Sequence, residues 1–302
     1  MKNQKISIIA EGGGMRGAYA LGAIDALYSH FGMKKADIVT GSSSGVGTLA
    51  YYTAGQFYPG FHIWPEELPK WRFLSKRNLL LGKPFLNVDY LVDNIFQDKR
   101  WPINPEKVFK SEIKLIIPLA NAETGKTKYF SNKNKFEGND LYKILKASMA
   151  LPFAYGKYIK LNDGNSYFDG AQGDPLPIRH HEIKDTRKII ILTKDIDYPI
   201  NLSWQERLFI ELMKPTLKPG AYKQLKTNKE FYKKRLEQIS TLETQGDIVI
   251  RPSSRLPRLD NSRQSIEDSI SKGKSDAISH KGLVELMREL KSSSRYKFYF
   301  EK

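Results

Sequence analysis

One serine of this sequence has the surroundings of a catalytic nucleophile. Ser43 lies between Gly41 and Gly45 in the spacing Gly-x-Ser-x-Gly, after the apolar run Ala36–Thr40 and before a helical pattern. A serine hydroxyl is a weak nucleophile until a base removes its proton, and a tight turn between a strand and a helix exposes it to both base and substrate. The pentapeptide by itself also fits a serine-rich turn that caps a helix. In this strand–turn–helix context it predicts nucleophilic chemistry at Ser43.

A glycine-rich segment nearer the N-terminus could supply a second part of such a site. It follows the apolar run Lys5–Ala10 and consists of Glu11, Gly12, Gly13, Gly14, Met15, Arg16 and Gly17. Backbone N–H groups at the start of a helix bind anions, so this loop could stabilise the oxyanion that develops during acyl transfer.

The same glycines also fit a dinucleotide-binding fingerprint. Gly12, Gly14 and Gly17 have the spacing G-x-G-x-x-G, which requires an acidic residue at the end of the following strand to hold the ribose hydroxyls. Asp37 is at about the right distance, but it opens that strand, and the strand closes on Thr40. A nucleotide-binding oxidoreductase is therefore the second hypothesis.

Two kinds of residue could act as the base for Ser43. A triad in the order serine, acid, histidine could use one of the downstream histidines His180, His181 and His280, although none of them lies in a recognisable motif. Asp169 follows a short strand and precedes Gly170 and Ala171, so its carboxylate can point out of a sheet and act as a base. An Asp-Gly pair is also an ordinary turn signal, and both kinds of base stay open at this point.

Taken together and in this order, the motifs resemble those of the patatin-like phospholipases, in particular their bacterial members. The similar segments are Glu11–Gly17, Gly41–Gly45, Ala147–Pro152 and Asp169–Ala171, and the resemblance covers roughly residues 5 to 195. Glu11 stands where many members have Asp, and Ala171 where many have Gly.

The resemblance implies a lipid acyl hydrolase of the phospholipase A or lysophospholipase type. It implies a Ser43–Asp169 dyad without a catalytic histidine, and an oxyanion hole from the amides of Gly12, Gly13 and Gly14, with Arg16 helping to fix the loop. It implies no cofactor and no metal.

Alternation of strand and helix patterns predicts an α/β fold, a three-layer sandwich with a mostly parallel central sheet. The expected strands include Lys5–Ala10, Ala36–Thr40, Ile113–Ala120, Lys188–Thr193 and Asp247–Arg251, with Lys128–Phe130 pairing back on the third as a hairpin. Expected helices include Met15–Ser29, Leu141–Ala150, Trp204–Met213, Lys223–Leu236 and Ser265–Leu290.

The chain divides by composition into two parts. Residues 1–196 are the expected catalytic domain, in which the aromatic segment 57–105 is a candidate lid over the site, and residues 197–302 form a mainly helical, basic extension. The aromatic residues of 57–105 could equally pack one side of the core.

The formal net charge of the 302 residues is +16, and there is no cysteine. Disulfides and thiolate chemistry are thereby excluded, and attraction to polyanions is expected.

The stretch Lys214–Arg235 combines basic and aromatic residues, which suits peripheral contact with an anionic membrane. A solvated helical face is the plainer alternative, and a non-enzymatic membrane or nucleic-acid binder is the third hypothesis. We expect a lipid ester substrate and no nucleic acid, and the sequence predicts no oligomeric state.

The N-terminal residues Met1–Lys5 lead into an apolar stretch that is too short for a signal peptide. No apolar run approaches the length of a membrane span. These features predict a cytoplasmic protein.

Overall fold

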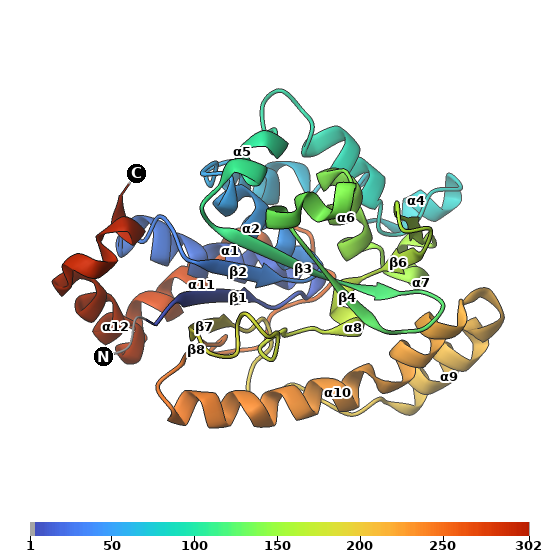
Figure 1. Cartoon of the computed structure of the whole chain (residues 1–302). Helices are drawn as coiled ribbons and strands as arrows, with labels where there is room; N and C mark the ends of the chain where they lie inside the picture. The colour runs from blue at the N-terminus through green and yellow to red at the C-terminus, as the bar shows by residue number, and fades with distance from the viewer. Residues whose placement is uncertain (1–3, 302) are drawn as a thin grey trace.

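The computed structural model describes residues 4–301. Met1–Asn3 and Lys302 lie outside the described residues, and part of the signal-peptide prediction rests on Met1–Asn3. One mixed sheet of eight strands runs through the molecule in the order β5-β6-β3-β2-β1-β7-β8, with β4 also paired to β3 (Figure 1). The strands are β1 Ile6–Ala10, β2 Ile38–Gly41, β3 Lys114–Asn121, β4 Thr127–Ser131, β5 Ile159–Lys160, β6 Ser166–Phe168, β7 Arg187–Ile191 and β8 Ile248–Ile250.

The centre of the sheet is parallel and its β5-side edge is antiparallel. β1 pairs in parallel with β2 and β7, β2 with β3, and β7 with β8. β4 and β6 run antiparallel to β3, and β5 runs antiparallel to β6. The predicted parallel sheet and the β3–β4 hairpin are confirmed.

Successive strand residues enter cores on opposite faces of the sheet, because side chains alternate along a strand. Ile8 and Ile189 belong to the larger core, and their neighbours Ile9 and Ile190 to the smaller one. Both faces are buried, which explains why these strands read as continuous apolar runs rather than as alternating ones.

Helices cover both faces and complete the three-layer sandwich that the sequence predicts. The larger core contains residues of α1 Gly17–Asp25, α2 Ser44–Thr53, α6 Leu141–Met149, α11 Arg263–Ser279 and α12 Lys281–Ser292. The long helix α10 Pro219–Thr244 covers the other face through Tyr232 and Ile239 (Figure 1). The remaining helices are short: α3 Gly60–His62, α4 Lys76–Leu80, α5 Pro105–Lys110, α7 Pro152–Tyr155, α8 Gly170–Gly173 and α9 Trp204–Met213.

Two expected helices are divided in the structure. The predicted helix Met15–Ser29 consists of a 3-10 turn, η1 Gly14–Arg16, then α1, then a π-helical turn, η2 Ala26–His30. The predicted helix Ser265–Leu290 breaks at His280, whose backbone is extended and whose Nδ1 accepts a hydrogen bond from the Leu283 N–H. His280 therefore caps α12, which the helical periodicity alone did not reveal.

The C-terminal region shares the sheet and the core with the N-terminal region. β8 pairs with β7, and α11 crosses α1 where two glycines allow close approach. A Cβ atom at Gly22 would lie 1.9 Å from the Ile270 carbonyl oxygen, and one at Gly273 would lie 2.0 Å from that of Tyr19. The division of the chain at residue 196 stays a prediction based on composition.

The segment 57–105 is built from short helical turns. Besides α3 and α4 it contains two π-helical turns, η3 Ile63–Glu67 and η4 Tyr90–Ile95. Three further turns lie elsewhere: η5 Asn132–Gly138, η6 Lys214–Thr216 and η7 Ser294–Phe300. Among residues 4–301, no helix is both long enough and apolar enough to cross a bilayer.

Candidate active site

Ser43 occupies a sharp turn between the end of β2 and the start of α2. Its φ of 51° and ψ of −126° lie in a region that residues other than glycine seldom adopt. Holding the backbone in such a conformation costs about 1–3 kcal/mol. Its backbone N–H donates to Ser148 Oγ at 3.2 Å, so the buried hydroxyl of Ser148 on α6 helps to hold the turn. Gly41 ends β2 and Gly45 lies in the first turn of α2, as their spacing around Ser43 predicts.

Asp169 lies directly against the serine hydroxyl. Ser43 Oγ donates to Asp169 Oδ2 at 3.0 Å, and the Ala171 N–H donates to the other carboxylate oxygen, Oδ1, at 2.8 Å. Burial raises the pKa of Asp169 to about 6, although these two hydrogen bonds and the nearby positive charge of Arg258 act in the opposite direction. A carboxylate with this pKa is ionised at neutral pH and can still accept a proton.

Gly170 turns the chain so that Asp169 can face Ser43. β6 ends at Phe168, and α8 begins at Gly170 with Asp169 as its N-cap. A Cβ atom at Gly170 would lie 2.0 Å from the Pro118 carbonyl oxygen on β3, so no other residue fits at this position without displacing the turn.

The glycine loop runs beside the serine. A Cβ atom at Gly12 would lie 2.9 Å from Ser43 Cβ, which shows how closely the two backbones approach. The Gly13 N–H donates to Ser44 Oγ at 3.1 Å, whereas the Gly12 N–H has no hydrogen-bond acceptor among residues 4–301. Gly14 has a φ of 63° and starts the 3-10 turn η1.

Buried charges hold the glycine loop in place. Arg16 is buried, and its Nε donates to the Gly13 carbonyl oxygen at 3.3 Å. Glu11 is buried and accepts a hydrogen bond from the Thr193 N–H at 2.7 Å while it pairs with Lys194. The loop is thereby tied to the residues that follow β7, which sequence reasoning did not identify because they lie outside every motif.

A loop from the C-terminal region also reaches the site. The Arg258 carbonyl oxygen accepts a hydrogen bond from the Met15 N–H at 3.0 Å. The Arg16 guanidinium lies 5.0 Å from the centre of the Tyr198 ring, and positive charges, that of Arg16 foremost, hold the pKa of Tyr198 below its usual value despite burial. No sequence signal marks Arg258 or Tyr198, since their position beside the glycine loop depends on the fold.

A cavity of about 930 Å³ opens next to Ser43 and Asp169. Ser43, Asp169 and the loop Gly12–Gly14 are among the residues that line it. Most of the apolar wall comes from the segment 57–105, which contributes Ile63, Trp64, Leu68, Phe73, Leu74, Leu79, Leu80, Phe85, Leu86, Val88, Leu91 and Phe96. Its volume and largely apolar lining suit a ligand with a long hydrocarbon part.

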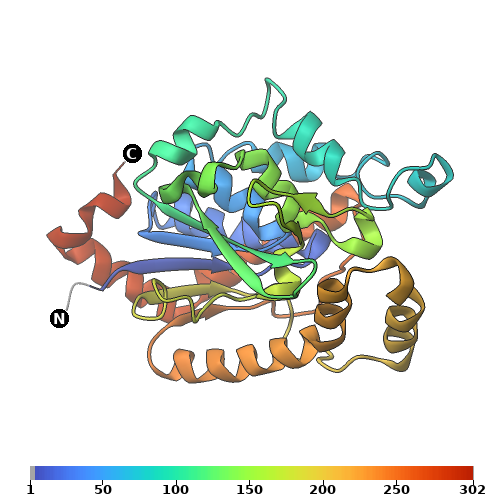
Figure 2. The same ribbon diagram turned by 45° about the vertical axis from the view of Figure 1, so that its right-hand side comes forward.

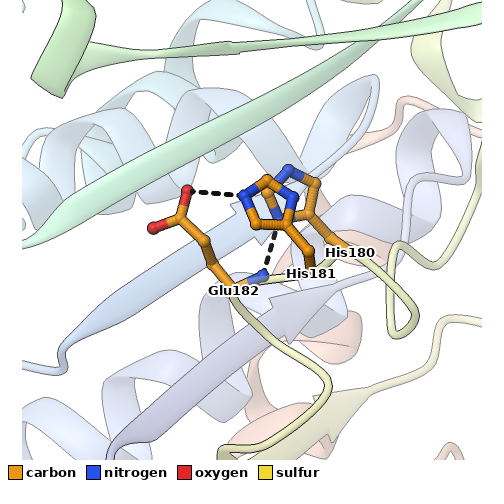
Figure 3. Close-up of side chains that lie close together, drawn as sticks. All are labelled: His180, His181 and Glu182. Carbon is orange, nitrogen blue, oxygen red and sulfur yellow. Dashed lines mark hydrogen bonds and ion pairs between the residues drawn. The ribbon is translucent and has the colours of Figure 1, made fainter.

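The downstream histidines lie away from this arrangement. Within residues 4–301, none of His180, His181 and His280 lines the cavity. His181 turns its ring toward Glu182, and His180 accepts from the Glu182 N–H (Figure 3). The Lys114 ammonium group donates to the Glu182 carboxylate at 2.6 Å, so the negative charge beside the two histidines is already balanced by a lysine.

Asp37 does not occupy the position that nucleotide binding requires. It precedes β2, at the opposite end of that strand from Ser43, and its Oδ2 accepts from the Ile6 N–H at 2.8 Å. The ribose-binding carboxylate expected at the carboxyl end of the second strand is replaced by the serine turn.

Comparison with known proteins now identifies the family. The model of the patatin-like phospholipases matches residues 8–180, which include the glycine loop, Ser43 and Asp169. The chain belongs to the patatin-like phospholipase family. The resemblance stated from the motifs is thereby confirmed.

Two further comparisons found proteins that are similar to this chain in sequence or in fold. The chain is 21% identical over 193 residues to the uncharacterized protein YjjU of Escherichia coli K12, and it spans about half of that curated relative: the match covers 62% of this chain and 51% of YjjU. VipD from Legionella pneumophila has a similar fold, with a TM-score of 0.55 at 12% identity over 95% of this chain and 67% of VipD. At this identity the likeness to VipD shows the fold alone.

Proposed function

We propose that this protein hydrolyses carboxylic ester bonds of lipids, as a phospholipase A or lysophospholipase. One observation carries the proposal: Ser43 Oγ donates to the buried carboxylate of Asp169 at 3.0 Å, and both residues line a cavity whose wall is largely apolar. Membership in the patatin-like phospholipase family supports the same reaction class.

In the proposed first step, Ser43 Oγ attacks the ester carbonyl carbon while its proton moves to Asp169 Oδ2. The tetrahedral intermediate collapses, the bond to the alcohol breaks, and the leaving alkoxide takes the proton from Asp169. Water then attacks the acyl-enzyme with Asp169 again accepting a proton, which returns to Ser43 Oγ as the fatty acid leaves. A carboxylate serves as base here because no imidazole lies beside Ser43 in residues 4–301.

We propose that the glycine loop stabilises the oxyanion. The Gly12 N–H has no acceptor among the described residues 4–301 and is adjacent to Ser43, so it is the best placed donor, and Gly13 and Gly14 follow it in the loop. The Gly13 N–H would have to leave Ser44 Oγ in order to contribute. Arg16 and Glu11 keep the loop in position. An oxyanion-hole donor of this kind is typically worth about 3 kcal/mol.

We propose that the acyl chain occupies the apolar part of the cavity and that segment 57–105 acts as a lid over it. The segment forms most of the apolar wall, so an acyl chain bound there would be shielded from water. Contact with an anionic membrane belongs to the same proposal, since the substrate resides in a bilayer.

The test compares the wild type with Ser43→Ala and Asp169→Asn on phospholipid vesicles and on a soluble short-chain ester. We expect both variants to lose at least about 1,000-fold in kcat, because the two groups act as a unit. A fluorophosphonate probe should label the wild type but not Ser43→Ala. The matched control is Asp185→Asn. The Asp185 carboxylate is exposed and contacts Lys184 rather than Ser43, so this variant should retain activity.

Activity that survives in both variants would contradict the dyad. His180→Gln and His181→Gln would then be the variants to measure. Absence of activity and labelling in the wild type, together with nucleotide binding, would favour the dinucleotide hypothesis instead.

A further inference from the structure

Two helices at one end of the molecule expose apolar side chains that nothing in the described chain covers. α4 and the residue after it present Leu79, Leu80 and Leu81, of which Leu80 is 88% exposed. α9 presents Trp204 and Leu212, each 70% exposed, together with Leu208 and Phe209. In both views α4 and α9 project at the same end of the molecule, beyond the sheet (Figures 1 and 2). We call these seven residues the apolar rim.

The apolar rim is continuous with the cavity beside Ser43. Leu79 and Leu80 line the cavity, as does Phe153 of α7. The rings of Phe153 and Phe209 are in edge-to-face contact, with centroids 5.7 Å apart, so α9 joins the wall of the cavity through Phe153. A hydrophobic surface therefore leads from solvent into the site.

The exposed face of α9 is a regular feature of the helix. Trp204, Leu208 and Leu212 are spaced by four residues and lie on one face, whereas Ile210 on another face is buried. Glu206 and Glu211 tie the helix to α10 through Lys229 and Lys226. α9 is thus held at its polar side with its apolar side free.

Unpaired positive charge accompanies the apolar rim. Residues 68–88 around α4 contain five basic residues and no acidic one. Lys70 pairs with Glu67, and four cations of the stretch form no ion pair within residues 4–301: Arg72, Lys76, Arg77 and Lys83. Arg72 and Arg77 flank the half-exposed indole of Trp71.

By contrast, the stretch Lys214–Arg235, which the sequence favoured for membrane contact, has most of its eight basic residues in ion pairs. Five of its cations have carboxylate partners: Lys218 with Glu123, Lys226 with Glu211, Lys229 with Glu206, Lys234 with Glu230 and Arg235 with Asp174. Tyr232 is buried in the core rather than exposed.

We propose that the apolar rim is the surface by which this protein docks on an anionic lipid bilayer. α4 and α9 insert their leucines and Trp204 into the interfacial region, and the unpaired cations of residues 68–88 contact the lipid headgroups. A bilayer fits better than a protein partner for two reasons. The exposed apolar side chains lie on two separate helices, α4 and α9, with basic residues beside α4. They also lie next to a cavity that is large enough for a lipid chain. This inference rests on the proposed lipid hydrolase function, since docking here places the cavity mouth against the lipid.

The test measures sedimentation of the protein with vesicles in a Ser43→Ala background, so that binding is scored without turnover. Vesicles of phosphatidylcholine alone are compared with vesicles that contain roughly 30 mol % phosphatidylglycerol. We expect binding to the anionic vesicles that weakens as salt increases. Leu81→Ser with Leu212→Ser, and separately Arg72→Glu with Lys83→Glu, should each weaken it at least about tenfold.

A charge-matched control lies at the opposite end of the molecule. Lys281→Glu with Arg288→Glu on α12 changes the net charge equally, far from the apolar rim (Figure 1), and should leave vesicle binding nearly unchanged. Thermal unfolding and size-exclusion chromatography check that each variant is folded. Equal loss in the α12 variant would overturn the proposal, since it would show attraction by overall charge.

Two other results would also overturn it. Vesicle binding that is unaffected by the α4 and α9 substitutions would exclude the apolar rim as the contact. A dimer in solution that Leu212→Ser dissociates, with no vesicle binding, would show that a second copy covers this face. Because binding is measured without catalysis, these outcomes are distinct from failure of the Ser43–Asp169 mechanism.

Discussion

At the scale of single residues, the site depends on a carboxylate held in an unusual environment. Asp169 is buried, and it accepts one hydrogen bond from Ser43 and one from the Ala171 N–H. Burial disfavours the ionised form and raises the pKa of Asp169 to about 6. The proposed base is therefore more basic than an exposed aspartate and remains mostly ionised at pH 7.

This shift predicts how activity depends on pH. The mechanism requires ionised Asp169, so kcat/KM should rise as pH increases through about 6 and level off above it. At pH 5 the group is mostly protonated, and we expect activity about tenfold below the plateau. The measurement is the pH profile of kcat/KM on a soluble ester whose own ionisation does not change in this range.

Arg258 provides a check on the assignment of that profile. Its positive charge lowers the pKa of Asp169, and its side chain is exposed. Arg258→Gln should therefore move the midpoint of the profile to higher pH. A profile that is flat down to pH 5, or one that Arg258→Gln leaves in place, would mean that another group controls the rate.

At the scale of elements, two close backbone approaches decide how the site is supported. Gly170 lies against the Pro118 carbonyl of β3 and aims Asp169 at Ser43. Gly22 and Gly273 let α1 and α11 pack backbone to backbone, so a helix of the C-terminal region supports the helix that follows the glycine loop.

The α1–α11 crossing can be tested with a single methyl group. Gly273→Ala places a Cβ atom 2.0 Å from the Tyr19 carbonyl oxygen, so the helices must separate and the free energy of unfolding should fall by about 3 kcal/mol. Gly282→Ala in α12 is the control, because its Cβ would meet only side-chain atoms, Cδ1 of Ile248 at 3.3 Å and Cε1 of His280 at 3.4 Å, and no backbone. Chemical denaturation of both variants gives the comparison, and equal stabilities would contradict the crossing.

At the scale of the whole molecule, the N-terminal and C-terminal regions share one sheet. β8 forms one edge beside β7, and α10 covers the face on which Leu176 and Ile190 lie. Arg258 additionally holds the glycine loop through the Met15 N–H. The basic extension therefore contributes to the support of the proposed catalytic residues.

A truncated chain tests this dependence. A fragment that ends at residue 196 would expose the edge of β7 and the surface of α1 that α11 covers. We expect it to aggregate or to unfold without a cooperative transition. Thermal unfolding followed by circular dichroism makes the measurement. A sharp transition with retained ester hydrolysis would instead establish residues 1–196 as an independent domain.

The sequence by itself determined the family, the fold class and the candidate dyad. Gly41, Ser43 and Gly45 could be recognised because a serine turn between a strand and a helix needs small residues at fixed spacing. The strands could be predicted because a sheet buried on both faces requires continuous apolar runs. The choice between Asp169 and a histidine was open from composition and spacing, and only the resemblance to a family favoured the aspartate.

Tertiary structure alone decided which distant residues meet. It placed Asp169 at 3.0 Å from Ser43 and kept His180 and His181 beside Lys114 and Glu182. It also brought Arg258 to the glycine loop, and it paired five of the eight basic residues of Lys214–Arg235 with carboxylates, whereas four of the five in residues 68–88 form no ion pair within residues 4–301. Sequence patterns report which face of an element is buried, whereas contacts between side chains far apart in the chain depend on how the elements pack.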